Sequence, residues 1–104
     1  MSNTQFTLVS NDEHSEWPPP PTYEIYVVTG DLAEKVRVKL QEGSDAAVEI
    51  QIKKSVVGYS EWTWWHDFEF TLLVSGLEVM GPDSVNDDDE GNMLKFLIDW
   101  LDND

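Results

Sequence analysis

The sequence has no cysteine, only two histidines, and only six basic residues among its 104. The absence of cysteine excludes a disulfide framework, a thiolate zinc site and a cysteine nucleophile. The longest uncharged, apolar-rich stretch is about Phe70–Leu77, far short of the roughly 18 residues that a membrane-spanning helix needs. The first residues carry neither the basic start nor the apolar run of a signal peptide. We therefore expect a soluble, cytoplasmic protein.

Acidic residues are in large excess. Twenty-one Asp and Glu against six Lys and Arg give a formal net charge of −15. Such a charge repels nucleic-acid phosphates and anionic lipid, so it argues against direct nucleic-acid binding and against a membrane-surface role. The chain is nevertheless 40% hydrophobic and 12% aromatic, which is too apolar for a disordered acidic tail. We expect residues 1–104 to form a single folded domain.

The N-terminal part, residues 1–21, has a strand signal followed by a loop. Phe6 and Leu8 alternate with polar residues in Gln5–Val9, which predicts a short strand. A polar stretch follows and ends in Pro18–Pro21, a run that favours a stiff, extended spacer. The alternative for these prolines, a ligand for a proline-binding module, rests on a very common pattern.

Apolar and polar residues alternate with a period of two over much of residues 22–80, which predicts an antiparallel sheet. The expected strands are Tyr23–Val28, Lys35–Leu40, Val48–Lys53, a long strand around Trp62–Leu72, and a short strand at Leu77 and Val79. Two of them, Lys35–Leu40 and Val48–Lys53, flank a glycine-bearing turn, so we expect them to pair as a hairpin. The inward side chains of this hairpin would be Val36, Val38, Leu40, Val48, Ile50 and Ile52. Its solvent-exposed face, or the end of the hairpin, would carry Lys35, Arg37, Lys39, Lys53 and Lys54.

The C-terminal part combines an acidic loop, residues 82–91, with a helix, residues 92–104. Apolar residues recur at spacings of one, three and four between Met93 and Leu101, so this helix needs a sheet face to cover its wide apolar stripe. Asp99, Asp102 and Asp104 oppose the helix dipole and predict a frayed last turn. The fold class that follows is α+β, mostly β: an antiparallel sheet of about four to six strands with one C-terminal helix packed on a face.

Catalytic and metal signals are weak. His66 falls on the aromatic face of the long strand and is expected to be a structural histidine, while His14 lies in a polar loop. No glycine-rich phosphate loop is present. Asp87–Gly91 fits no register of an EF-hand loop, although loose cation binding there stays open. We expect no enzyme activity, no cofactor and no metal site.

The negative charge is unevenly distributed along the chain. Residues 1–54 carry nine acidic and five basic residues, a net of −4, whereas residues 55–104 carry twelve acidic residues and only Lys95, a net of −11. Self-repulsion of this size costs stability. The asymmetry therefore favours a strongly positive partner, and inside a cell such partners are mostly nucleic-acid-binding proteins. The alternative is that the charge serves solubility alone.

Trp65 stands out within the cluster of three tryptophans at positions 62, 64 and 65. Alternation points it away from Trp62 and Trp64. It is either an aromatic anchor ringed by carboxylates or a cover for a second small core under the N-terminal strand or Trp17. The predicted partner-binding residues are Glu61, Trp65, Asp67, Glu69, Asp87, Asp88, Asp89 and Glu90.

These observations favour a small acidic inhibitor that binds and blocks a basic nucleic-acid-binding protein, such as a host nuclease or defence complex, by nucleic-acid mimicry. In size and composition the chain is similar to antagonists from phages and mobile elements, which would place it in a host cytoplasm, but no motif supports that likeness. One alternative is an immunity protein that neutralises a nuclease toxin. Another is an acidic structural or assembly accessory protein. We expect a monomer or a homodimer.

Overall fold

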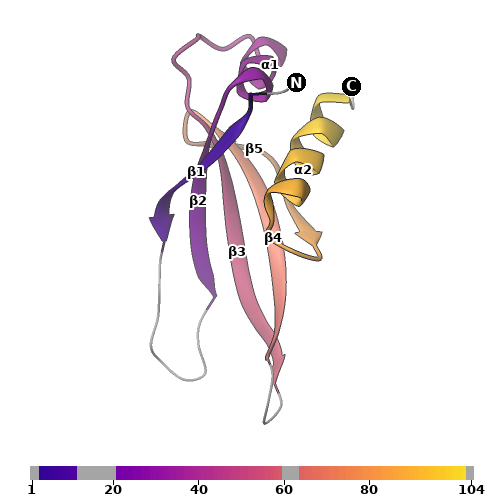
Figure 1. The fold of residues 1–104 in the computed structure, drawn as a ribbon. Coiled ribbons are helices and arrows are strands. Elements are labelled where there is room, and N and C mark those ends of the chain that lie inside the picture. The colour runs from indigo at the N-terminus through magenta and orange to yellow at the C-terminus, as the bar shows by residue number, and fades with distance from the viewer. Residues whose placement is uncertain (1–2, 12–20, 60–63, 103–104) are drawn as a thin grey trace.

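The computed structural model describes residues 3–11, 21–59 and 64–102. Five strands form one antiparallel sheet in the order in which they follow one another along the chain (Figure 1). The elements are β1 (Gln5–Asn11), β2 (Thr22–Thr29), α1 (Asp31–Lys39), β3 (Val48–Tyr59), β4 (Trp64–Val74), β5 (Leu77–Val85) and α2 (Glu90–Asp102). An antiparallel sheet with a C-terminal helix confirms the predicted fold class.

Alternation along the central strands divides the sheet into a helix-covered face and an opposite face, called the open face below. Ile50 and Ile52 of β3 and Phe70 and Leu72 of β4 are fully buried on the helix-covered face. Phe96 of α2 meets Phe70 there edge to face, with ring centroids 5.6 Å apart. Within the described residues, the hydrophobic core lies between this face and the two helices.

The predicted strand Lys35–Leu40, and with it the predicted hairpin, is wrong. This segment belongs to helix α1, in which Leu32, Ala33 and Val36 are buried and Val38 is 70% exposed. The buried spacing is that of one helix face, so the alternation of Val36, Val38 and Leu40 does not reflect a strand. β3 instead pairs with β2 and β4.

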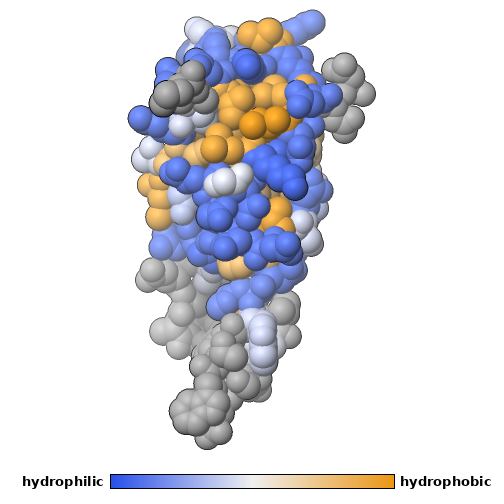
Figure 2. Space-filling view, turned by 45° about the vertical axis from the view of Figure 1, so that its right-hand side comes forward, coloured by the Kyte–Doolittle hydropathy of each residue, from blue (hydrophilic) through white to orange (hydrophobic). Residues whose placement is uncertain are grey.

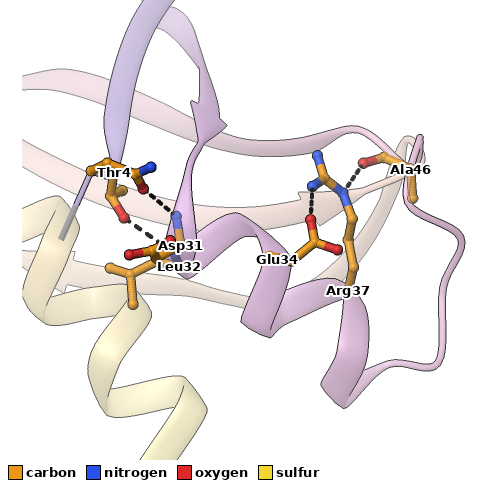
Figure 3. A network of polar contacts seen from close by, with 7 residues as sticks. Thr4, Asp31, Leu32, Glu34, Arg37 and Ala46 are labelled. Atoms are coloured by element: carbon orange, nitrogen blue, oxygen red, sulfur yellow. Dashed lines mark hydrogen bonds and ion pairs between the residues drawn. The ribbon is translucent and has the colours of Figure 1, made fainter.

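Helix α1 is held at its start by residues from before β1, as Figure 3 shows. Gly30, at the N-cap position, has no side chain to accept a hydrogen bond. The backbone N–H of Asp31 donates to Asn3 Oδ1 at 2.8 Å, and that of Leu32 donates to Thr4 Oγ1 at 3.1 Å. Side chains distant in sequence therefore satisfy amide groups that a local cap normally satisfies.

Helix α2 corresponds to the predicted C-terminal helix, begins two residues earlier than predicted, and is described through Asp102. Its last turn has no basic residue of its own. Lys39 of α1 supplies the cation: its Nζ donates to the backbone carbonyl of Trp100 and lies 4.3 Å from the centroid of the Trp100 ring. A positive charge at this end of a helix offsets the dipole. Figure 2 shows the molecule turned toward the side on which α2 lies. Apolar residues gather there toward the end of the molecule at which α1 lies.

Strand β5 is longer, and the acidic loop shorter, than predicted. The strand continues past Gly81–Pro82, and Asp83 lies opposite Phe70 of β4. The register between β4 and β5 shifts twice along this stretch. Gly81 has φ +106, and a Cβ there would lie 2.5 Å from the Phe70 carbonyl oxygen, so only glycine permits this close approach. The predicted loop over 82–91 is therefore wrong for its first residues.

Several predictions fall outside the described residues. They concern His14, Trp17, the prolines at 18–20, Glu61 and Trp62. Within the part of the chain that the structure describes, neither helix is long and apolar enough to cross a membrane.

Candidate functional site

The predicted partner-binding residues are divided between the two sides of the sheet. Trp65, Asp67 and Glu69 alternate along β4 and lie on the open face, because Phe68 and Phe70 between and beside them belong to the helix-covered face. Residues 87–90 lie instead at the start of α2, on the helix-covered side. Glu61 lies outside the described ranges. The structure therefore brings together only three of the predicted residues as one surface, called the Trp65 surface below.

Trp65 is 52% exposed and rests on a bulge in the neighbouring strand. Its cross-strand partner is Gly58, which follows a register shift after Val56 in β3. A Cβ at Gly58 would lie 3.0 Å from Trp65 Cε3, so the missing side chain leaves the space that the indole occupies. The core of the described residues does not include Trp65. Of the two interpretations of this residue, exposure favours the anchor.

The two acidic members of the Trp65 surface have different neighbours. Asp67 lies opposite Ser55 of β3, and Glu69 lies opposite Lys53. Both carboxylates are partly exposed. Beside Glu69 the open face holds a shallow cleft of about 250 Å³, lined by Tyr23, Gln51, Lys53, Glu69, Thr71, Leu73, Glu78 and Pro82. Beyond the tryptophan, the open face thus offers carboxylates, one base and some apolar surface.

On the other side of the sheet, Asp88 is part of a partly buried ionic cluster. Lys54 forms ion pairs with Asp88, at 2.9 Å, and with Glu24, which is only 8% exposed. Tyr26 donates its hydroxyl hydrogen to the second oxygen of Glu24 at 3.1 Å. Lys54 therefore ties β2 to the segment that leads into α2, and Asp88 serves the fold.

The pKa values within this cluster follow from burial and pairing. Burial lowers the pKa of Lys54, but its contacts with Glu24 and Asp88 outweigh burial and raise that pKa above its usual value. Burial raises the pKa of Asp88, but the contact with Lys54 and the hydrogen bonds around Asp87 and the Asp88 backbone together outweigh burial and lower the pKa below its usual value. Burial and the hydrogen bond to Glu24 both raise the pKa of Tyr26. The ionised forms of Lys54 and Asp88 are thus the stable ones.

Asp89 and Asp87 organise the start of α2. The backbone N–H of Asn92 donates to Asp89 Oδ1 at 2.8 Å, an N-cap bond three residues along the chain. The side-chain amide of Asn92 donates to the Asp87 carbonyl at 3.0 Å, and the Asp88 N–H donates to Asp87 Oδ1 at 2.8 Å. Asp87, Asp89 and Glu90 are exposed, and Asp88 is partly buried. The acidic run therefore builds the helix start while most of its charge stays at the surface.

His66 and the acidic side chains are the described groups that bear on catalysis or metal binding. His66 is exposed, and its ring stacks on Phe68 with centroids 6.0 Å apart. Among the described residues, no three His, Asp or Glu side chains are grouped so that they could hold a metal ion.

Sequence reasoning missed Gly58 and Tyr23, which shape the open face. Tyr23 is 39% exposed and lines the shallow cleft. A glycine inside an alternating strand pattern is a known signal of a bulge or of a close approach by a neighbour. That signal was present at Gly58 and predicts where the indole lies. Tyr23 carried no such signal.

Comparison with known protein families, with curated protein sequences and with solved structures gave no match to this chain.

Proposed function

We propose that this chain is a non-enzymatic inhibitor that binds a basic nucleic-acid-binding protein, such as a host nuclease or defence complex, and blocks its nucleic-acid site. The observation that carries the proposal is the placement of Trp65. Its indole is half exposed, lies against Gly58, and shares the open face with Asp67 and Glu69. Aromatic side chains held in place beside charged groups are frequent energetic centres of protein interfaces.

Net charge supports the choice of partner. With a charge of −15, the chain attracts basic proteins over a distance and repels acidic ones, which speeds encounter with the former at low salt. Residues two apart on one strand face have Cα atoms about 6.8 Å apart, so their carboxylates form a row along the strand. Such a row of negative charges can occupy a surface shaped for phosphates, which is the sense in which the chain would mimic nucleic acid.

The experiment is affinity capture from a lysate of the source cell, first at low and then at high salt, with variants of the Trp65 surface. The test variants are Trp65→Ala and the pair Asp67→Asn with Glu69→Gln. The matched control is the pair Glu42→Gln with Asp45→Asn, which makes the same change of charge on exposed residues between α1 and β3.

We expect wild type and control to retain a basic nucleic-acid-binding protein that high salt releases. Both test variants should retain much less of it, because they lack the anchor or the adjacent charge. Equal retention by the test and control pairs would mean that only total charge matters, and the Trp65 surface would then have no role. Recovery of no basic protein would contradict the proposal itself.

A further inference from the structure

The first strand is an uncharged edge on a strongly acidic molecule. β1 lies at one end of the sheet, and no described strand pairs with its outer side. Its seven residues, Gln5–Asn11, include neither a charged residue nor a proline, although 26% of the chain is charged. Leu8 is 43% and Val9 is 55% exposed. An edge of this kind is a template for pairing with another strand.

The opposite edge, β5, is different. It carries Glu78 and Asp83, its register against β4 shifts twice, and Pro82 within it has no N–H to donate. Charge, irregular register and proline are features that oppose edge-to-edge pairing. β1 shares only the second of them, in a single register shift between Leu8 and Ser10, after the regular stretch that contains Thr7. Of the two ends of the sheet, only β1 is therefore suited to accept a further strand.

The side-chain pattern of β1 is suited to pairing with itself. Phe6 lies opposite Val28 and Leu8 opposite Tyr26, so both belong to the helix-covered face, while Thr7 belongs to the open face. In an antiparallel pair of two identical strands centred on Thr7, Phe6 of each copy faces Leu8 of the other, and the two Thr7 residues face each other. Aromatic–aliphatic and Thr–Thr pairs are favourable across antiparallel strands.

We propose that two copies of this chain associate through β1, antiparallel and centred on Thr7, so that their two five-stranded sheets become one continuous sheet across a two-fold axis. The pairing adds backbone hydrogen bonds at the edge and covers the exposed side of Leu8. The inference goes beyond the proposed function and does not depend on it, because the Trp65 surface lies on β4.

The absence of charge on β1 favours a second copy of this chain as the partner that pairs with this edge. A basic partner gains nothing from a strand without charge, whereas two chains of net charge −15 can approach closely only where neither carries charge. β1 is separated by two strands from β4 and by three from β5, the strands that belong to the more acidic half of the sequence. Association stops at two copies because each has a single edge of this kind, so the interface closes on itself.

The register can be tested by cross-linking, because the chain has no cysteine of its own. Thr7→Cys places one thiol on each side of the two-fold axis, at a separation that a disulfide can bridge. Thr29→Cys is the control: it is exposed on the neighbouring strand β2, three strand spacings from its counterpart, which is beyond disulfide reach. Oxidation should give a covalent dimer from Thr7→Cys and none from Thr29→Cys.

Charge substitutions test the same geometry without covalent chemistry. Thr7→Lys and Thr7→Glu each place like charges directly opposite one another and should weaken self-association about tenfold. Mixing the two variants should restore dimers, since residue 7 then faces an opposite charge. Thr29→Lys should dimerise as wild type does. Sedimentation analysis gives the dissociation constants, and far-ultraviolet circular dichroism confirms that each variant is folded.

Self-association should also tighten as salt rises, because salt screens the repulsion between the copies. Binding to a basic partner changes in the opposite direction, so the two associations are distinguishable in one protein. A wild-type chain that stays monomeric at high concentration and high salt would overturn the proposal. Equal cross-linking through Thr7→Cys and Thr29→Cys, or no rescue in the mixture, would overturn it as well.

Discussion

Lys54 shows how one side chain can change the meaning of an acidic sequence. Sequence analysis placed it with the solvated bases, yet it follows Ile52 by two residues and lies on the helix-covered face. There it neutralises Glu24 and Asp88, which are a buried carboxylate and a partly buried one. The alternation of β3 already implied this position. The alternation of β3 was not used to place Lys54 on the buried side, because a lysine is seldom expected near a core.

The ionic cluster should make stability depend on Lys54. Lys54→Met leaves Glu24 buried without its cation, and breaking such a pair typically costs about 3 kcal/mol. Urea unfolding at neutral pH measures the change in the free energy of unfolding. Lys53→Met, a change of the same kind one residue away on the open face, is the control and should cost well under half as much. Equal costs would show that the cluster contributes nothing specific.

The Asp88 carboxylate should give this stability a defined pH dependence. Its pKa is lowered in the folded state, so its contribution is complete above the usual value of 3.8 and is lost as the pH falls through the lower folded pKa. The pKa of Lys54 is raised, so its contribution is complete below 10.5 and is lost as the pH rises through the higher folded pKa. Asp88→Asn should therefore cost about 1–2 kcal/mol at neutral pH and almost nothing at strongly acidic pH. A cost that does not change with pH would contradict the assignment.

Asp89 allows its roles as helix cap and as surface charge to be separated. Asp89→Ala removes the oxygen that accepts from the Asn92 N–H and should cost about 1 kcal/mol of stability. Asp89→Asn keeps an acceptor oxygen and should be nearly neutral in thermal unfolding. If capture of a basic partner also survives in Asp89→Asn, the residue serves the helix and not the interface. Similar losses of stability in both variants would contradict the capping role.

At the scale of elements, a helix or strand was predicted where a local sequence pattern determines it, and was missed where contacts between residues distant in sequence determine it. The long strand and the C-terminal helix were predicted because their burial patterns are continuous along the chain. Helix α1 was missed because its start is satisfied by Asn3 and Thr4, which only the folded chain brings near Asp31. A period-two pattern over six residues was too short to outweigh these tertiary contacts.

The remote cap of α1 can be tested directly. Asn3→Ala removes the acceptor for the Asp31 N–H and should lower the free energy of unfolding by about 1 kcal/mol. Amide hydrogen exchange at the start of α1 should become faster, while exchange in β3 and β4 follows only the global change. Gln5→Ala, another exposed position nearby, is the control. Unchanged exchange at the start of α1 in Asn3→Ala would show that the helix does not need this cap.

The bulge at Gly58 should control the candidate site without any change of charge. Gly58→Val places side-chain atoms where the Trp65 ring lies, since even a Cβ would be 3.0 Å from that ring. The indole must move, and capture of the basic partner should fall about as far as in Trp65→Ala. A fold check by circular dichroism accompanies the comparison. Full capture by a folded Gly58→Val variant would mean that the position of the indole is unimportant.

At the scale of the whole molecule, the sequence shows that most of the excess negative charge lies in the second half of the chain. It does not show which surfaces of the fold carry that charge. The structure assigns part of the run at 87–90 to the start of α2 and to Lys54, and it leaves Asp67 and Glu69 beside Trp65 on the open face. Which acidic residues face outward depends on strand register and on partners distant in sequence. Composition contains no information about either.

The central claim is that this chain occupies the nucleic-acid site of a basic protein, and competition tests it most directly. The captured protein is purified, bound to a fluorescent oligonucleotide at low salt, and titrated with wild-type chain or with the variant pair Asp67→Asn and Glu69→Gln. We expect wild type to displace the oligonucleotide in a salt-sensitive manner, and the variant pair to need about tenfold more protein, equivalent to 1.4 kcal/mol. Binding of the chain that leaves the oligonucleotide in place would contradict the account.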